Sequence, residues 1–351
     1  MTGTVRTIVG VRHRTKVPVS PGRRPADATI RGVEVTPIDA APVVVVVGSL
    51  NVDQIAYTSR VPAAGETVMG DRYVMGFGGK GANQAVMARR LGAGVEFVGA
   101  LGEDVFADMT IDNMAGQGID TRFIARVPGS SGVAPIWVEP DGTNRIIVVA
   151  GANDRVEPGV AADAVRSLER VDVVVGQLEI PQAATAAAFG AARQRGVPTI
   201  LNPAPAAALD SGLLAVTDWL IPNETEFAIL AGEGHTGQGG AGDRDRYRRF
   251  AERTGTRLVV TLGSEGALLV GRDGDDELVP ATPVTPIDTT GAGDAFVGAF
   301  AYGLAAGLPE LEAVRLGVAL ASDSVTKPGT QTSFATPERA AELLGVVLAR
   351  I

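Results

Sequence analysis

The run Val43-Val-Val-Val-Val-Gly48 decides the fold class of this chain. Consecutive β-branched residues without polar alternation, closed by a glycine, predict a strand that is buried on both of its faces. Strands of this kind occur in parallel sheets that carry helices on both sides. The fold therefore begins at Val43, well inside the chain.

Similar apolar runs recur downstream, and Ala-rich segments of helical pattern lie between several of them. The strand-like runs are 95–100, 171–175, 199–201, 219–221 and 258–262, and the helical segments are 160–168, 183–193 and 247–254. Alternation of strands and helices predicts an α/β fold with a doubly wound, mainly parallel central sheet flanked by helices.

Two segments break this alternation. The segment 53–77 is short and polar, and Pro62 and Gly65 interrupt it. The segment 132–149 has the pattern of a hairpin with its turn at Asp141-Gly142. Together they predict a small separate β-sheet, which we interpret as a lid. The Gly-rich segment 232–242 predicts a mobile loop or insertion.

Composition excludes several classes of protein. The chain has 351 residues, 45% of them hydrophobic, a net charge of −9 and no cysteine. A general nucleic-acid surface, disulfides and thiolate metal sites are therefore not expected, and no apolar run is long enough for a membrane span. Residues 1–42 are basic and predict a flexible extension, with a targeting peptide as the alternative, ahead of one large domain at 43–351. The acidic balance fits a cytoplasmic enzyme.

Polar residues follow several of the predicted strands. These residues are Asn51 and Asp53, Glu179, Asn223 and Glu226, and the loop 261–266. Ligands of open α/β sheets bind at the carboxyl ends of the strands, so these side chains are expected at one edge of the sheet. For Asn51 and Asp53 a solvated turn remains the alternative. Asn223 and Glu226 would suit either a hydrated Mg²⁺ or a helix N-cap.

The segment Asp288-Thr-Thr-Gly-Ala-Gly-Asp294 precedes an apolar run that predicts a buried helix from Ala295. Gly291, Ala292 and Gly293 would then present unpaired N–H groups at a helix N-terminus, which binds anions. A carboxylate at Asp294 beside such a site is suited to take a proton from a hydroxyl during phosphoryl transfer. The alternative is that Asp294 caps the helix.

The segment Gly76-Phe-Gly-Gly-Lys-Gly-Ala-Asn83 has the spacing of a dinucleotide fingerprint. It follows a weak strand rather than the first buried one, so we reject that interpretation. Gly79 and Gly81 instead predict a backbone-lined pocket, in which Asn83 would supply a donor and an acceptor to a polyol.

These motifs, in this order, resemble those of the ribokinase-like family of carbohydrate kinases. The resemblance runs from about Val43 to the C-terminus. It includes the segments 48–53, 62–67, 177–179, 201–206 and 222–226, which are similar to those of members that phosphorylate ribose.

The resemblance implies an ATP-dependent transfer to O5 of D-ribose. The pentose would be surrounded by Asn51, Asp53, Gly79, Lys80, Gly81, Asn83, Glu179 and Asp294. Asp294 would be the base, and Gly291, Ala292 and Gly293 the anion hole. Mg-ATP would be held by Asn223, Glu226, Thr261, Gly263, Ser264, Glu265, Gly266 and Gly293, with Mg²⁺ bound to Asn223 and Glu226 through water.

The resemblance also implies a monovalent cation, usually potassium, beside the anion hole. Its ligands would fall on Asp288, Thr290, Ser324, Lys327, Gly329 and Ser333, several of them through main-chain carbonyls. Val318 departs from the family pattern where a His or Asn often approaches the base, which leaves the adenine contacts open. A homodimer joined through the lids is expected. The alternatives are a kinase for deoxyribose, fructose, a nucleoside or a sugar phosphate, and a non-catalytic sugar- or nucleotide-binding protein.

Overall fold

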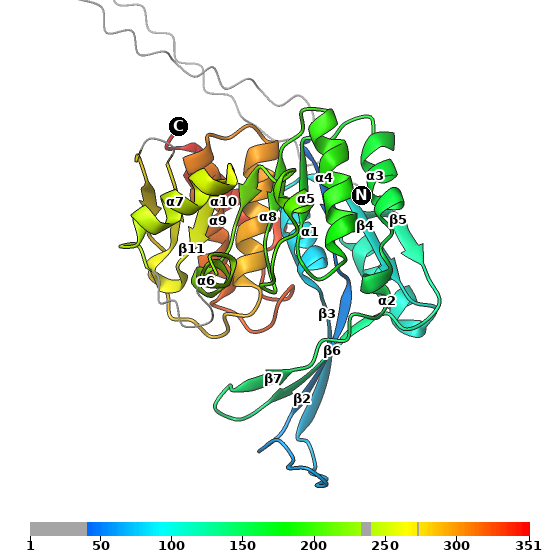
Figure 1. The fold of residues 1–351 in the computed structure, drawn as a ribbon. Helices are drawn as coiled ribbons and strands as arrows, with labels where there is room; N and C mark the ends of the chain where they lie inside the picture. Colours follow the sequence, from blue (N-terminus) through cyan, green and yellow to red (C-terminus); the bar gives the residue numbers. More distant parts are fainter. Residues whose placement is uncertain (1–40, 233–239, 272–273) are drawn as a thin grey trace, which may run out of the picture. The chain divides into compact units, whose positions relative to one another are not determined.

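The computed structural model describes residues 41–232, 240–271 and 274–351 (Figure 1). The predicted N-terminal extension, apart from its last two residues, lies outside the described residues, and so does the centre of the predicted loop 232–242. Within the described ranges, no helix is both long enough and apolar enough to cross a bilayer.

The described residues form a nine-stranded sheet with the order β13-β12-β11-β10-β9-β8-β1-β4-β5. Its strands are β1 (Val43–Val47), β4 (Gly94–Leu101), β5 (Asp120–Arg126), β8 (Val173–Gly176), β9 (Thr199–Leu201), β10 (Trp219–Leu220), β11 (Arg257–Thr261), β12 (Ala267–Leu269) and β13 (Glu277–Val279). All neighbours from β11 to β5 pair in parallel, and only β12 and β13 pair antiparallel. The predicted mainly parallel sheet is confirmed.

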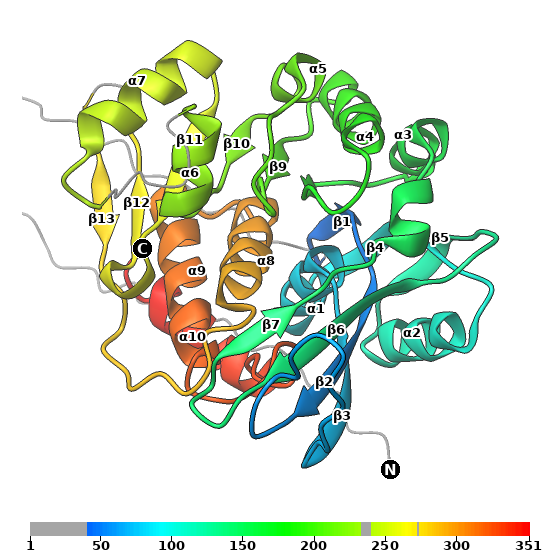
Figure 2. The same cartoon turned by 60° about the horizontal axis from the view of Figure 1, so that its bottom comes forward.

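Helices cover both faces of this sheet (Figure 2). Side chains of β1 point alternately to the two layers, with Val44 and Val46 in one core cluster and Val45 and Val47 in the other. The first cluster contains residues of α1 (Lys80–Arg90), α2 (Val105–Gly116), α8 (Ala292–Ala305), α9 (Glu310–Ser324) and α10 (Pro337–Leu348). The second contains residues of α3 (Pro158–Ser167), α4 (Gln182–Gln194), α5 (Ser211–Leu214), α6 (Glu224–Leu230) and α7 (Arg244–Thr254).

A second sheet, of four strands, projects from the body of the fold (Figure 1). Its order is β3-β2-β6-β7, with strands β2 (Asn51–Tyr57), β3 (Arg72–Gly78), β6 (Gly132–Val138) and β7 (Asn144–Ile146). The pair β2–β6 is parallel and the other two pairs are antiparallel. Both interrupting segments of the sequence therefore join one small sheet, as predicted.

Helix α8 begins where the glycine-rich segment predicts. Gly291 is its N-cap and has φ of 78°, a left-handed conformation that strongly favours glycine. The helix is apolar almost all round and is buried from Asp294 to Gly303. A side chain at Gly298 would place its Cβ 2.4 Å from the carbonyl oxygen of Gln84, so the small residue lets α8 lie directly against α1.

Candidate active site

Asp294 lies in the first turn of α8 and is 7% exposed. It does not cap the helix, because the N-cap is Gly291 and no side chain bonds to the cap. Its Oδ2 accepts a hydrogen bond from Asn83 Nδ2 (2.9 Å), and its Oδ1 accepts one from Gln84 Nε2 (3.0 Å). Burial raises the pKa of Asp294, while Lys80 and the two amides act in the opposite direction. A buried carboxylate with a raised pKa is suited to accept a proton.

A cavity of about 170 Å³ opens in front of this helix terminus. It is lined by Lys80, Asn202, Ala204, Ile221, Asn223, Glu226, Thr261, Gly291, Gly293, Asp294 and Val297. The predicted anion hole, the predicted base and part of the predicted nucleotide site therefore face one space. Helix N-termini attract anions, so the geometry suits a phosphoryl group that lies beside Asp294.

Lys80 is the cation of this cavity. The lining carboxylates are those of Glu226 and Asp294, and Glu179 lies close enough to act on the Lys80 charge as well. Burial by itself lowers the pKa of Lys80, but the attraction of these carboxylates outweighs it and raises the pKa. The side chain therefore stays charged and offsets the acidic surroundings that an incoming phosphate would meet.

Glu179 follows β8 and is held at the N-terminus of α1. Its Oε2 accepts hydrogen bonds from Ser49 Oγ (2.6 Å) and from the backbone N–H of Lys80 (3.0 Å). The N–H of Gly81 in turn donates to Ser49 Oγ (3.3 Å). A carboxylate at a helix N-terminus is stabilised by the macrodipole, which fixes Glu179 beside the segment 79–81.

Gly79 and Gly81 allow a close approach of backbone, but the group that lies against them is the protein segment after β1 rather than a ligand. A Cβ at Gly79 would lie 2.8 Å from the Ser49 carbonyl oxygen, and one at Gly81 would lie 2.7 Å from the Ser49 nitrogen. Both glycines therefore let α1 begin directly against the residues that follow β1. The backbone-lined pocket expected from the sequence stays a prediction.

Asn51 begins β2 and is buried rather than placed in a solvated turn. Asn153 fixes its amide: Asn153 Nδ2 donates to Asn51 Oδ1 (2.8 Å) and to the Leu50 carbonyl (3.1 Å). Asn153 Oδ1 accepts from the Leu50 N–H (2.9 Å), which sets the orientation of Asn153 itself. The Asn51 oxygen is thereby engaged, and its NH₂ group is left as the donor for a ligand.

Asp53 lies two residues further along β2, on the same side of the strand as Asn51. Burial, followed by the charges of Glu179 and Asp294, raises the pKa of Asp53 to about 7. The carboxylates of Asp53, Glu179 and Asp294 thus lie close enough together for their charges to interact. Mutual repulsion of this kind is relieved when hydroxyl groups donate to the oxygens.

Asn223 and Glu226 form the helix cap that was the alternative to a metal site. Asn223 Oδ1 accepts from the Glu226 N–H (2.8 Å), and a Glu226 oxygen accepts from the Asn223 N–H (2.8 Å). Both still line the cavity, next to Thr261, which bridges to Asn223 at the end of β11. Gly263, Ser264 and Glu265 form a short 3₁₀ turn one residue after Thr261, and Gly266 ends it.

The residues around Asp288 join the predicted cation loop, Ser324–Ser333, to the start of α8. Asp288 Oδ2 accepts from the Gly329 N–H (2.8 Å), and Oδ1 accepts from the Thr290 N–H (2.9 Å). Burial opposes the charge of Asp288, but these hydrogen bonds outweigh it and lower its pKa. Each carboxylate oxygen accepts one hydrogen bond and keeps a second lone pair, so an ion here would have both the carboxylate and main-chain oxygens as ligands.

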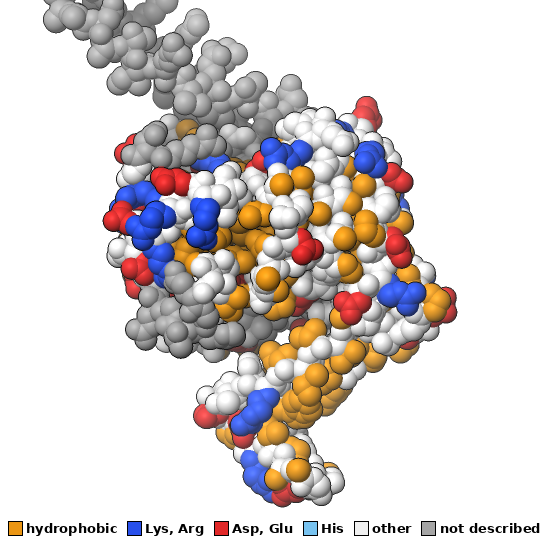
Figure 3. All heavy atoms as spheres, viewed as in Figure 1, with side chains coloured by type: hydrophobic (Ala, Val, Ile, Leu, Met, Phe, Trp, Pro, Cys, Tyr) orange, Lys and Arg blue, Asp and Glu red, His pale blue; other side chains and the backbone are white. Residues whose placement is uncertain are grey.

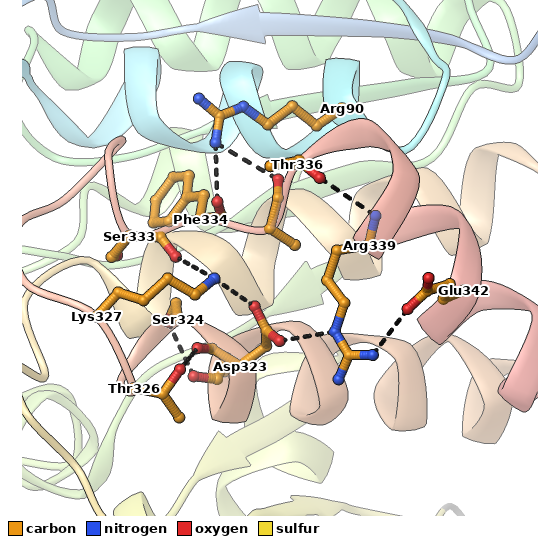
Figure 4. Close-up of polar contacts among 12 residues, drawn as sticks. Arg90, Asp323, Ser324, Thr326, Lys327, Ser333, Phe334, Thr336, Arg339 and Glu342 are labelled. Carbon is orange, nitrogen blue, oxygen red and sulfur yellow. Dashed lines mark hydrogen bonds and ion pairs between the residues drawn. The ribbon is translucent and has the colours of Figure 1, made fainter.

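The side chain of Lys327 connects the end of α9 to Ser333 at the other end of this loop (Figure 4). Its Nζ donates to Asp323 Oδ2 (2.8 Å) and to the Ser333 carbonyl (3.1 Å), and Arg339 Nε donates to Asp323 Oδ1 (2.9 Å). Ser324 and Ser333 bond through their hydroxyls to carbonyls of the same region. The six predicted cation residues therefore lie on two segments that are hydrogen-bonded to each other.

Val318, where the sequence left the adenine contacts open, is 6% exposed and belongs to the core on α9. Sequence reasoning missed Ser49, Gln84, Asn153, Gln177 and Gln331, which bond to the predicted site residues or to one another. Gln84 directly follows Asn83 of the glycine-rich motif, and Ser49 and Gln177 lie in the segments 48–53 and 177–179, so these three had a sequence signal.

Known proteins share this sequence and fold. Residues 42–337 match the sequence profile of the pfkB family of carbohydrate kinases. A deoxyribokinase of Salmonella typhi is 38% identical over 86% of this chain and 99% of its own, and a ribokinase of Mus musculus is 38% identical over 84% and 93%. The solved structure of Arabidopsis thaliana ribokinase complexed with ribose and ATP has a TM-score of 0.79 at 32% identity, covering 87% of this chain and 99% of that one.

The chain therefore belongs to the pfkB family of carbohydrate kinases. Its relatives place it with the ribokinase-like members, and it is an ATP-dependent sugar kinase.

Proposed function

We propose that this kinase transfers the γ-phosphoryl group of ATP to the 5-hydroxyl of D-ribose, giving D-ribose 5-phosphate and ADP. The observation that carries the proposal is the position of Asp294. It lines the cavity at the α8 N-terminus and lies near enough to Asp53 and Glu179 for their charges to interact, and these carboxylates suit sugar hydroxyls. The known complex of the Arabidopsis relative with ribose and ATP supports the same pair of substrates.

In the proposed reaction Asp294 accepts the proton of the 5-hydroxyl as the sugar oxygen bonds to the γ-phosphorus. The bond between that phosphorus and the bridging oxygen breaks, and ADP leaves with the electron pair. Gly291 and Gly293 at the α8 N-terminus, with Lys80, offset the negative charge of the transferring group. The four-stranded sheet is proposed as a lid that excludes water.

Magnesium and a monovalent cation fit the donor atoms that are present. Among residues 41–232, 240–271 and 274–351, no cluster of three or more acidic or histidine side chains could hold a metal. Magnesium would therefore be held through the nucleotide phosphates, with Asn223 and Glu226 acting through water, and would neutralise phosphate charge. The oxygens of Asp288, Thr290 and the loop Ser324–Ser333 suit potassium, which would add positive charge near the α8 N-terminus.

Ribose is favoured over deoxyribose by the orientation of Asn51. Asn153 occupies its oxygen, so the NH₂ group is the half of the amide that is left as a donor to a 2-hydroxyl. Deoxyribose would leave that buried donor unpaired, which costs about tenfold or more in kcat/KM. Deoxyribose remains the second candidate, because the Salmonella typhi relative is a deoxyribokinase.

A substrate panel tests the proposal. ADP release is measured with D-ribose, 2-deoxyribose, fructose, adenosine and fructose 6-phosphate, each with Mg-ATP, with and without potassium. Ribose-dependent turnover that potassium stimulates would support both the acceptor and the cation site. Turnover with another acceptor alone would overturn ribose and keep Asp294 as base, and none at all would overturn the kinase activity proposed here.

Sugar binding is expected to weaken as pH falls below 7. The pKa of Asp53 is raised to about 7, so this side chain loses its charge below that pH and accepts hydrogen bonds less well. Hydroxyl donors favour the ionised form, and sugar binding should therefore release protons near neutral pH. Calorimetric titration of sugar in buffers of different ionisation enthalpy measures this release. It should vanish in Asp53→Asn, and equal release in the two proteins would contradict the assignment.

The exposed apolar face of the small sheet fits a homodimer, our proposed assembly. A band of hydrophobic side chains runs over this sheet (Figure 3), and Ile146, Ile147, Val148 and Val149 form a consecutive run that is 44–55% exposed. Tyr73 on β3 is 62% exposed as well. Exposed runs of this kind mark association surfaces, and a second small sheet of the same composition is their natural cover.

Substitution Ile147→Glu is expected to convert the dimer to a monomer, because it places a charge in the centre of the apolar run. Light scattering should give twice the chain mass for the unsubstituted protein and the single chain mass for this variant. Val160→Glu on α3 is the matched control, since Val160 is also exposed, at 47%. A monomeric unsubstituted protein would rule out the dimer.

A further inference from the structure

The carboxylate of Asp294 is surrounded by a network of buried amides. Asn83 Nδ2 and Gln84 Nε2 donate to its two oxygens, one to each. Gln84 Nε2 donates in addition to Asn202 Oδ1 (3.1 Å). These amides are nearly inaccessible, with exposures of 5% for Asn83 and 1% for Gln84. Because water does not reach these amides, their hydrogen bonds must be made within the protein, and the orientation of each amide decides whether a donor or an acceptor meets Asp294.

Each of the two amides is oriented by a further amide. Gln331 Nε2 donates to Asn83 Oδ1 (3.1 Å), and Gln177 Nε2 donates to Gln84 Oε1 (2.7 Å). Gln331 is itself fixed, since its Oε1 accepts from Asn113 Nδ2 of α2 (3.3 Å). Rotating either Asn83 or Gln84 by half a turn would set an amide oxygen against the carboxylate and two NH₂ groups against each other. The network therefore points its N–H groups at Asp294.

We propose that Gln84 and Gln331 are positioning residues of the kinase reaction, which hold the Asp294 carboxylate ionised and aimed at the acceptor hydroxyl. Gln84 acts by direct contact, and Gln331 acts through Asn83. The inference rests on the proposed role of Asp294 as base. It assigns a role to two side chains that the sequence motifs and the cavity do not include.

Charged groups on four elements or loops also face Asp294. Lys80 on α1 favours its charge, whereas Asp53 on β2, Glu179 after β8 and Glu226 on α6 oppose it. The amides supply the donors that these three carboxylates cannot. A carboxylate whose two oxygens both face N–H donors is favoured as the anion, and the acidic neighbours make those donors more important.

Gln331 also connects the base to the predicted cation loop. It lies between Gly329, which bonds to Asp288, and Ser333, which accepts from Lys327. Thr330 next to it packs against the α8 cap, since a Cβ at Gly291 would lie 2.6 Å from Thr330 Cγ2. The position of this loop is therefore transmitted to Asp294 by one intervening side chain, Asn83.

The test compares the pH dependence of kcat in the full-length enzyme and in Gln84→Met and Gln331→Met. Methionine is similar in size and cannot donate. The acid limb of kcat should move to higher pH by about one to two units in Gln84→Met, since one charge-assisted hydrogen bond is lost. A smaller shift in the same direction is expected in Gln331→Met. The KM for sugar should change less than kcat.

Thr110→Val is the matched control, because Thr110 is also a buried polar residue and its hydroxyl bonds to none of the described residues. Thermal unfolding checks that the variants are folded, and Gln331→Met carries the test if Gln84→Met is not. Acid limbs that coincide with that of the unsubstituted enzyme would overturn this inference and leave the kinase assignment intact. Absence of sugar-dependent turnover in the unsubstituted enzyme would instead overturn the proposed function, and this inference with it.

Discussion

Asp294→Asn is expected to lower kcat by about 10²–10⁴-fold, the range typical of a lost general base. The amide keeps the size of the side chain and cannot accept the hydroxyl proton. It also brings an NH₂ group against donors from Asn83 or Gln84, so some loss of stability will accompany the loss of rate. Steady-state ADP release with saturating sugar and Mg-ATP measures the effect.

The matched control for this prediction is Asp163→Asn, an exposed aspartate on α3 whose ion pair with Arg166 lies on the surface. It should leave kcat within about twofold, since exposed pairs contribute little. Turnover of Asp294→Asn within a few-fold of the unsubstituted enzyme, with native unfolding, would remove Asp294 from the role of base.

Lys80→Met is expected to lower kcat/KM for Mg-ATP by about 10²–10³-fold, the cost typical of removing one preorganised electrostatic contact to the transferring group. Lys80 lines the cavity together with Glu226 and Asp294. If the Lys80 charge is removed, the triphosphate would approach the carboxylates of Glu226 and Asp294 without that cation to offset their negative charge. The same loss should raise the pKa of Asp294 further and move the acid limb of kcat upward.

Arg166→Met on α3 removes an exposed cation without touching the cavity and is the control for Lys80→Met. Calorimetric binding of Mg-ADP and kinetics with Mg-ATP should both be unchanged in Arg166→Met. If Lys80→Met bound and turned over Mg-ATP like the unsubstituted enzyme, the helix N-terminus alone would have to hold the phosphates.

The six inner strands of the central sheet, β11, β10, β9, β8, β1 and β4, were predictable because they are short, continuous apolar runs. The outer strands β5, β12 and β13 were not predicted, since they are more polar or only three residues long. The small sheet was predictable in part. The hairpin at 132–149 has a turn signal, but nothing in the sequence pairs β2 in parallel with β6, residues that lie about 80 positions apart. Such pairing depends on tertiary contacts, which local pattern does not encode.

The candidate site was predictable where glycine-rich turns and strand ends mark it. The side chains that support it were not, because an isolated buried glutamine has no local signature. Gln331 contacts Asn83 across 248 residues of sequence. Asn153, in the short turn 151–155, orients Asn51 from a segment that carries no motif. Asn223 and Glu226 were found from the sequence, but the sequence offered a helix cap and a metal site as alternatives. In the structure the same two residues form the capping box of α6 and also line the cavity.

Three strands of the small sheet meet the body of the protein at one rung, while the fourth, β7, leads back to the body through residues 147–150. Asn51 pairs with Gly78 on one side and with Gly132 on the other, and all three strands start or end there. A side chain at either flanking position would displace a site residue, because a Cβ would lie 2.4 Å from Asp53 Oδ2 at Gly78 and 2.3 Å from Asn51 Oδ1 at Gly132.

A tilt of the small sheet at this rung would move Asn51, one of the residues proposed to hold the sugar. A sugar that contacts these residues more favourably in one tilt binds that tilt more tightly. By linkage, its binding shifts the sheet toward that tilt by the same factor. Substitutions far out on the sheet, near Tyr57 or Val138, should then alter sugar affinity without touching the sugar. Substitutions several residues along the strands from the sugar site should therefore change which sugar this kinase prefers.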